Sequence, residues 1–271
     1  MRPYVVLHKP RGKTPLEVVN AWKEEQNLSN DFPVAYAGRL DPMAEGKLLI
    51  LLSDECKRQK EYTNLDKEYV VEVLFDISTD TGDVLGHPML QKTRTTIQRK
   101  ELASALMKEH GTHEREYPVF SSKTVSGKPL FLYALEETLD TITIPTHSET
   151  IYKTSALEIA SLSSEQLQAR INDALSVTPT SDEPSKALGA DFRIGTIAPQ
   201  WIELFENAQD RTFTVATLRV TCGSGTYMRT LAARIGESLD TTACALSIDR
   251  TKIGTYQPLP FGLGFWKKEY R

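Results

Sequence analysis

The first candidate for chemistry is an aspartate, Asp41, in the stretch AYAGRLDPMAEGKLLILL (residues 35–52). Its neighbours predict a helix start, because aspartate accepts hydrogen bonds from free backbone amides and proline suits the first helical position. An aspartate surrounded by such amides also stays ionised, as a nucleophile must. We therefore expect Asp41 to lie at the start of a helix, and a catalytic role is compatible with that position.

Two further residues have side chains that suit an active site. Tyr69 begins the alternating apolar pattern of KEYVVEVLFDI, which predicts one face of a strand. Arg229 follows the glycine turn GSGTY and opens the predicted helix MRTLAARIGESLD. Arginine can hold a carboxylate through two bonds and is always charged. Taken singly, however, a strand tyrosine is more often a core residue and an arginine more often a surface ion-pair residue.

Other common catalytic motifs are missing. CGSGTY lacks both the dinucleotide fingerprint and a phosphate-loop lysine, and Ser224 does not form a nucleophile elbow. His110 and His113 have no third metal ligand nearby, and the acidic turn STDTGD lacks the spacing of a calcium loop. The three cysteines include no close pair, which argues against a zinc site or a disulfide framework. The sequence therefore predicts neither a metal nor a cofactor.

Composition is that of an ordinary globular protein, with 271 residues, 40% hydrophobic residues and a net charge of −4. No apolar run is long enough for a membrane span and no secretory signal is evident, so we expect a cytoplasmic protein with no membrane partner. The acidic balance does not favour nucleic-acid binding. Residues 1–14 nevertheless carry four basic residues and no acid, and such local patches can bind phosphate.

The surrounding elements predict how these residues are positioned. A helix is expected from about Thr14, another over TTIQRKELASALMKEH, and strands over 149–160 and TFTVATLRVTC. Residues 161–210 contain the polar linker SVTPTSDEPSKALG between two helical segments, and we interpret them as an insertion within a single catalytic domain spanning 1–271. Strands interrupted by helices and turns predict an α+β fold around a mixed, mostly antiparallel central sheet.

Several stretches, in order, carry a family resemblance. GRLDPMAEGKLLI resembles the Gly-x-Leu-Asp-Pro-x-Ala-x-Gly motif of the TruB-type tRNA pseudouridine synthases (the pseudouridine-55 class) and their archaeal and eukaryotic relatives. HKPRG, KEYVVEVLFDISTDTGDVLG, CGSGTYMRTLAARIGESL and LSIDRTKIG are similar to further motifs of that family. YPVFSSKTVSGKPLF is similar to another, with Phe120 in place of a tyrosine. Together the matching stretches cover roughly residues 1–160 and 211–254.

The resemblance implies the pseudouridine synthase fold and a division of labour. Asp41 would be the catalytic carboxylate that attacks the uridine, Arg229 its partner, and Tyr69 the ring beside the flipped base. Tyr227 and Ile248 match pocket walls. A uridine in a folded RNA arm must be extruded to be reached. Weaker candidates for RNA backbone contacts are the basic residues Lys9, Arg11, Lys13 and Lys128. The isomerisation needs no cofactor.

Three departures from the family pattern stand out. Arg39 replaces a small residue two positions before Asp41, where it could touch RNA or form an ion pair. Tyr36 stands where a histidine is frequent, and an aromatic ring could stack on a base there. Only 17 residues follow Gly254, so we expect no separate C-terminal RNA-binding domain. The 161–210 insertion either compensates for that domain or is a surface excursion, and we favour the surface excursion.

The resemblance implies isomerisation of one uridine in tRNA, at position 55 of the T arm. Since the guide-RNA-dependent relatives rely on a C-terminal RNA-binding domain that we do not expect here, we predict a stand-alone tRNA enzyme that uses no guide RNA, and a monomer is the default expectation. Two alternatives stay open. One is a non-catalytic RNA-binding or assembly protein on the same fold, although Asp41, Tyr69 and Arg229 are all present. The other is a pseudouridine synthase that acts on another RNA. The sequence does not decide whether Asp41 attacks the sugar or the base.

Overall fold

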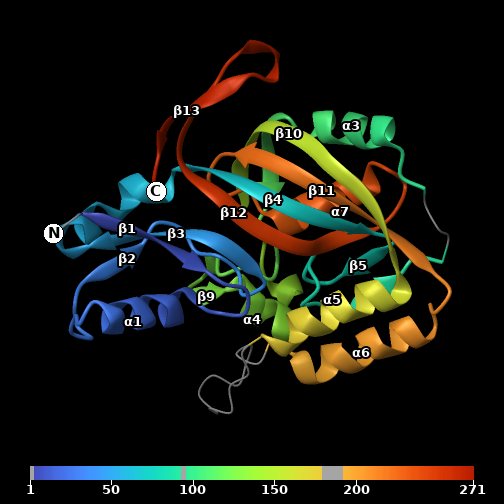
Figure 1. Cartoon of the computed structure of the whole chain (residues 1–271). Helices are drawn as coiled ribbons and strands as arrows, with labels where there is room; N and C mark the ends of the chain where they lie inside the picture. The colour runs from blue at the N-terminus through green and yellow to red at the C-terminus, as the bar shows by residue number, and fades with distance from the viewer. Residues whose placement is uncertain (1–2, 93–95, 179–191) are drawn as a thin grey trace.

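A large mixed sheet organises the molecule (Figure 1). The computed structural model describes residues 3–92, 96–178 and 192–271, so most of the linker SVTPTSDEPSKALG lies outside the described residues. The strand order is β1-β3-β12-β4-β11-β10-β7, with β2 paired to β3 and β13 paired to β12. Among the strands of the described residues, β3 and β12 pair in parallel and the other pairs are antiparallel. The predicted α+β fold with a mostly antiparallel sheet is confirmed.

The strands of this sheet have the following bounds: β1 (Tyr4–Lys9), β2 (Val34–Tyr36), β3 (Ala44–Leu52), β4 (Asp66–Phe75), β7 (Gly111–Glu116), β10 (Thr146–Ser163), β11 (Thr212–Cys222), β12 (Ala243–Pro258) and β13 (Gly264–Glu269). Two small hairpins lie beside it, formed by β5 (Ile77–Thr79) with β6 (Pro88–Leu90) and by β8 (Thr124–Val125) with β9 (Lys128–Pro129). The helices are α1 (Pro15–Glu25), α2 (Gln59–Thr63), α3 (Arg99–Lys108), α4 (Leu130–Leu135), α5 (Ser164–Ser176), α6 (Ile194–Glu206) and α7 (Met228–Glu237).

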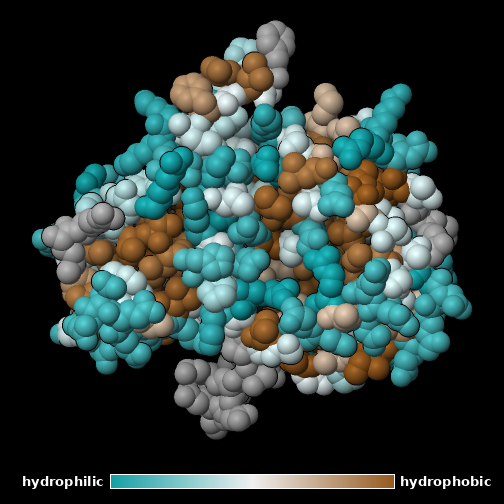
Figure 2. Space-filling model, viewed as in Figure 1, coloured by the Kyte–Doolittle hydropathy of each residue, from teal (hydrophilic) through white to brown (hydrophobic). Residues whose placement is uncertain are grey.

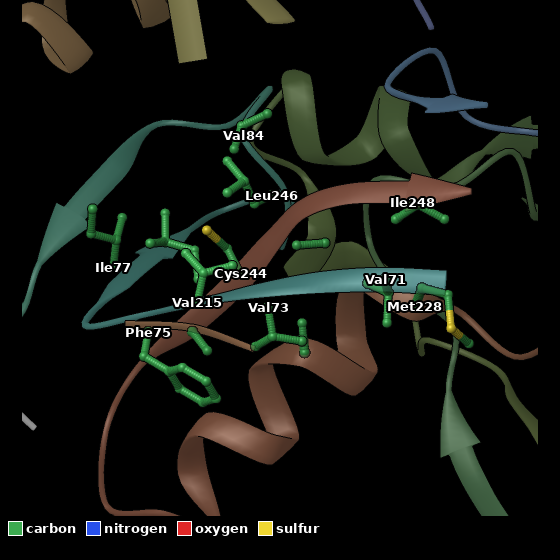
Figure 3. Close-up of a cluster of buried hydrophobic side chains, with 14 of the residues drawn as sticks. Val71, Val73, Phe75, Ile77, Val84, Val215, Met228, Cys244, Leu246 and Ile248 are labelled. Carbon is green, nitrogen blue, oxygen red and sulfur yellow. The ribbon is translucent and has the colours of Figure 1, made fainter. Parts of the chain in front are cut away.

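Strand β4 runs through the middle of the core. Val71, Val73 and Phe75 are almost fully buried, as the alternating sequence predicts for one face of a strand. Figure 3 shows Val73 and Phe75 projecting from β4 toward α7. Because Tyr69 belongs to the same alternating series, the α7 face of β4 carries both this part of the core and the tyrosine implied as catalytic.

The predicted helix after Asp41 is wrong. The backbone amide of Ala44 donates to the carbonyl of Asp41 across 3.1 Å in a tight turn, and the next residues form β3. Leu48 and Leu49 are both fully buried, because β3 lies inside the sheet and is covered on both faces. A strand buried on both faces gives a continuous apolar run, which cannot be told from a buried helix by periodicity alone.

The segment between β10 and β11 contributes to the core. Helices α5 and α6 pack against each other beneath the sheet in the view of Figure 1. Leu167 and Ile171 of α5, and Trp201 and Phe205 of α6, are buried in the main hydrophobic cluster. The expectation of a surface excursion is therefore wrong for these two helices, although their interpretation as an insertion within the family fold stays a prediction.

The last residues form a hairpin that rises from the body. β12 continues to Pro258 and turns back through β13, which pairs with it from Gly254 onward. At its tip Leu259, Leu263 and Phe265 are exposed, and apolar atoms are visible there in Figure 2. The residues up to Pro258 and those of β13 are thus part of the sheet in this structure.

Candidate active site

The backbone around Asp41 is held in place by Arg250 of β12. The Arg250 guanidinium donates to the carbonyls of Gly38, Arg39 and Lys47 at 3.3, 3.2 and 2.8 Å. Gly46 lies where β3 meets β12, with a φ of +106°, and a Cβ there would lie 2.5 Å from the Arg250 carbonyl oxygen. Only glycine permits this approach. A glycine is therefore required at position 46 of the Asp41 motif for a structural reason.

Asp41 meets Arg229 at the start of α7. Arg229 Nε donates to Asp41 Oδ2 at 2.8 Å. Its two other nitrogens donate to the carbonyls of Thr81 at 2.7 Å and Phe120 at 3.0 Å. The Arg229 side chain is only 4% exposed, whereas that of Asp41 is 45% exposed. The arginine is thus a fixed, buried support, and the carboxylate that it orients remains open to solvent.

A pocket of about 310 Å³ opens beside this pair. Tyr69, Tyr227 and Ile248 line it with aromatic and apolar surface, and Arg39, Lys67 and Arg250 also contribute. Burial raises the pKa of Tyr69, and burial with the nearby Asp41 charge raises that of Tyr227 to about 12. Both phenols therefore keep their protons at neutral pH and can donate hydrogen bonds. The pocket therefore has apolar walls and a few hydrogen-bonding groups, which suits a flat ring with polar substituents.

The structure adds residues that the sequence analysis did not assign to the site. Tyr227 packs edge-on against Tyr117 and His147, with ring centroids 6.3 and 5.9 Å away. Arg250 and Lys67 also line the pocket. Arg250 belongs to the motif LSIDRTKIG and Lys67 to KEYVV, both of which are described above. Their position in those motifs was the available signal. In the part of the chain that the structure describes, no cluster of three metal-ligating side chains occurs.

The family model described as TruB family pseudouridylate synthase (N terminal domain) matches residues 27–174, more than half of the chain. The chain belongs to the TruB family. Asp41 and Tyr69 lie inside the matched range, and Arg229 lies beyond it. Within the described segments, no helix of this family member is both long and apolar enough to cross a membrane.

Individual relatives extend the similarity over almost the whole chain. A protein of Caldicellulosiruptor saccharolyticus named tRNA pseudouridine synthase B is 26% identical over 256 residues, covering 94% of this chain and 69% of the relative. A protein of the same name from Bacillus cytotoxicus is 28% identical over 258 residues, covering 95% and 67%. These alignments include the region of Arg229, which the family model does not reach.

Solved structures support the fold. A chain of a Cbf5-Nop10-Gar1 complex superposes with a TM-score of 0.54 at 18% identity, covering 93% of this chain and 48% of that one. A chain of the archaeal box H/ACA sRNP Nop10-Cbf5 complex gives 0.50 at 17% identity, with 93% and 47% covered. This TruB-family chain spans about half the length of those chains, and the likeness concerns the fold alone.

A second carboxylate, that of Asp83, also lies close to Arg229. Asp83 Oδ2 lies 3.6 Å from Arg229 Nε, and the Asp83 side chain is 6% exposed. Its turn, STDTGD, is part of a stretch that is similar to a family motif, but no role in the site was predicted for Asp83 itself. Its backbone is fixed by Gly82, whose φ is +78° and whose missing Cβ would lie 3.0 Å from the Arg229 carbonyl. Burial raises the pKa of Asp83 from 3.8 to about 6.

Asp83 is expected to make stability depend on pH. A carboxyl whose pKa is higher in the folded than in the unfolded chain stabilises the fold fully below pH 4, and this contribution is lost as the pH rises through 6. A shift of this size corresponds to about 3 kcal/mol. The unfolding free energy of Asp83→Asn should therefore fall less than that of the wild type between pH 4 and pH 7. Urea titrations of both proteins across this range measure the difference, and parallel curves would contradict the assignment.

The two residues that depart from the family pattern near Asp41, Arg39 and Tyr36, differ in their relation to the pocket. Arg39 lines the pocket next to Asp41. Tyr36 does not line it: this residue lies on β2, partly buried against the cluster of Val19, Leu48 and Ile50. The possible RNA contact of Arg39 and the stacking role of Tyr36 stay predictions.

Among the basic candidates, the prediction for Lys9 is wrong. Its side chain is fully buried, and Nζ donates to the carbonyls of Ala44 at 2.6 Å, Pro42 at 3.3 Å and Pro10 at 3.1 Å. It ties β1 to the turn that follows Asp41 and is not accessible to an RNA backbone. An isolated sequence cannot show this, because a lysine in a basic stretch is normally solvated.

The other basic candidates are nearer the surface and have acidic partners. Arg11 pairs with Asp173, Lys13 with Glu17 at 3.2 Å, and Lys128 with Glu136. Exposed ion pairs of this kind contribute little stability and can be exchanged for a phosphate contact. Their contacts with RNA stay predictions.

Replacing Lys9 with methionine is expected to lower the unfolding free energy by about 2–3 kcal/mol, since three buried carbonyls would lose a charged donor. The turn after Asp41 would also lose its side-chain hydrogen bonds to β1, so activity should fall as well. Lys13→Met is the matched control, because that exposed residue contributes less than about 1 kcal/mol. Chemical denaturation of both variants measures this, and equal stabilities would refute the role assigned to Lys9.

Proposed function

We propose that this protein isomerises a specific uridine of tRNA to pseudouridine, at position 55 in the T arm. The observation that carries the proposal is the ion pair of Asp41 with the buried Arg229 at a pocket of base size. The names of the TruB-family relatives, which are tRNA pseudouridine synthases, support tRNA as the substrate.

In the proposed reaction the target uridine is extruded from the RNA into the pocket, which costs a few kcal/mol of stacking. Asp41 then attacks the uridine and initiates cleavage of the N1–C1′ glycosidic bond. The freed uracil turns within the pocket, C5 bonds to C1′, the bond formed by Asp41 breaks so that the carboxylate is released, and the hydrogen on C5 leaves as a proton. No atom is gained overall, because N1 takes up a proton in place of the bond to the sugar.

Arg229, Tyr69 and Ile248 each have a role in the proposed reaction. Arg229 holds the Asp41 carboxylate in a fixed orientation through its Nε. Tyr69 and Ile248 supply the surface on which the base packs, and the protonated Tyr69 hydroxyl can donate a hydrogen bond to the sugar or base. A pocket of about 310 Å³ leaves a uracil room to turn.

The proposal includes a cytoplasmic monomer that acts without a guide RNA. The tRNA enzymes are 26% and 28% identical to this chain, whereas the Cbf5 chains are 18% and 17% identical. The greater similarity to the tRNA enzymes favours a stand-alone tRNA enzyme over a subunit of a guide-RNA particle.

Mapping of the modified nucleotide tests the substrate. Unmodified tRNA transcript, incubated with enzyme, is treated with carbodiimide and read by primer extension. A single stop at the T-arm uridine is expected, and a transcript with cytidine at that position should give none. Stops at other uridines, with the T arm unmodified, would show that the enzyme acts elsewhere. No stop despite tight tRNA binding would favour the non-catalytic RNA-binding alternative.

A further inference from the structure

Helix α6, which belongs to the segment between β10 and β11, is attached to the turn that carries Asp83. Trp201 Nε1 donates to the Val84 carbonyl at 3.1 Å, and Gln200 Oε1 lies 2.9 Å from His87 Nδ1. A third attachment, through Arg193 just before the helix, lies at the active-site end of the same turn. The helix thus fixes the turn at both of its ends.

Arg193 connects two segments that are far apart in the sequence. Its Nη1 donates to Asp80 Oδ2 at 2.5 Å, and its guanidinium carbon lies 4.4 Å from the centre of the Phe120 ring. An arginine over an aromatic face is an attractive cation–π contact. Phe192 and Arg193 both have left-handed backbones, with φ of +49° and +57°. Such strained positions in non-glycine residues cost about 1–2 kcal/mol each and persist where the surroundings fix them.

These two segments are the ones that hold Arg229. Thr81, next to Asp80, offers the carbonyl that accepts from Arg229 Nη1, and Phe120 itself offers the carbonyl that accepts from Nη2. Arg193 therefore contacts each of the two segments at, or next to, a residue whose carbonyl orients Arg229. A shift of either carbonyl would turn the guanidinium and move Nε relative to Asp41.

We propose that Arg193 is a positioning residue of the active site, which fixes the two carbonyls that orient Arg229 and thereby sets the orientation of Asp41. The inference rests on the proposed function for its effect on turnover. It assigns to the 161–210 segment a contribution to catalysis that does not require any contact with RNA.

Two variants of similar size separate this role from simple stabilisation. Arg193→Met keeps a long apolar stem without the charge, and Arg193→Lys keeps a cation that can pair with Asp80 and lie over Phe120. Misplacement of a catalytic group by about 1 Å can cost about a hundredfold. We expect kcat to fall about tenfold to a hundredfold in Arg193→Met, with KM and the Kd for tRNA within about twofold. Arg193→Lys should recover most of the rate.

Arg170→Ala is the matched control. Arg170 lies on α5 of the same segment and forms an ion pair with Glu72 on the opposite face of β4 from Tyr69. Its loss should loosen the segment and lower the melting temperature while kcat is retained. If Arg170→Ala and Arg193→Met reduced kcat equally, or if Arg193→Met kept the wild-type kcat, the positioning role would be refuted.

A second measurement does not depend on activity. In protein labelled with ¹⁵N-arginine, the Arg229 Nε–H resonance, assigned by its loss in Arg229→Lys, reports the geometry of this group directly. It should shift in Arg193→Met and in Asp80→Asn, which breaks the same ion pair without altering α6, and stay in place in Arg170→Ala. An unmoved resonance in both variants would overturn the inference even if the wild type proved inactive on tRNA, an outcome that would separately refute the proposed function.

Discussion

Asp41→Asn is expected to fold like the wild type and to lose turnover by at least about 10⁴-fold, the scale on which removal of an essential nucleophile acts. Folding should survive because the Asp41 side chain is 45% exposed and an amide oxygen can still accept from Arg229 Nε. Turnover should not survive, since a neutral amide cannot attack the uridine. Single-turnover conversion of tRNA transcript, followed by nuclease digestion and chromatography, measures the loss.

Glu45→Gln is the control for Asp41→Asn, because it removes an acid from the same stretch of chain without touching the pair with Arg229. It should keep a rate within about threefold of the wild type, as is usual for a surface change without a named mechanism. Equal losses in the two variants would mean that general acidity near the pocket, rather than the Asp41 carboxylate itself, governs the reaction.

The second large effect is expected at Arg229. Arg229→Lys keeps the charge, but an ammonium cannot serve Asp41 and the carbonyls of Thr81 and Phe120 with the same planar geometry. We expect turnover to fall by about 10²–10³-fold, as when one preorganised donor is removed from an active site. Arg229→Ala should also lose about 3–5 kcal/mol of stability, because Asp83 would remain buried without a counter-charge.

Arg219, exposed on β11, supplies the matched control. Arg219→Lys and Arg219→Ala should leave both turnover and the unfolding free energy close to wild type, within about 0.5 kcal/mol. Turnover rates and urea titrations of the four variants measure these differences. An Arg229→Lys enzyme with the wild-type rate would show that the carboxylate needs only a nearby charge and no fixed orientation.

Much of the site could be anticipated from sequence because each motif combines a chemical residue with a backbone requirement. Asp41 comes with Gly46, which permits the contact of β3 with β12, and Arg229 follows a glycine turn that starts α7. Alternation along β4 placed Tyr69 on the same face as the buried valines. The mostly antiparallel sheet followed from the same strand and turn patterns.

The rest depended on tertiary contacts that local patterns do not encode. The prediction of a helix after Asp41 fails because β3 is buried on both faces, and its continuous apolar run also fits a buried helix. Lys9 lies in a basic stretch, yet it is enclosed between β1 and the Asp41 turn. Arg193 and Trp201 follow a polar linker, and nothing in their neighbourhood indicates that α6 attaches to the turn of Asp83. The hydrogen-bond partners of Arg193 and Trp201 on this turn are more than a hundred residues away and become visible only in the folded chain.

We propose above all that Asp41 drives conversion of a tRNA uridine to its carbon-linked isomer. It is tested most directly by release of tritium from a tRNA transcript labelled at uridine C5, because the new C5–C1′ bond must expel that hydrogen. We expect release of one tritium per tRNA with the wild type and none above background with Asp41→Asn, while both proteins bind the transcript equally. Release by the folded Asp41→Asn protein at a near-native rate would contradict it.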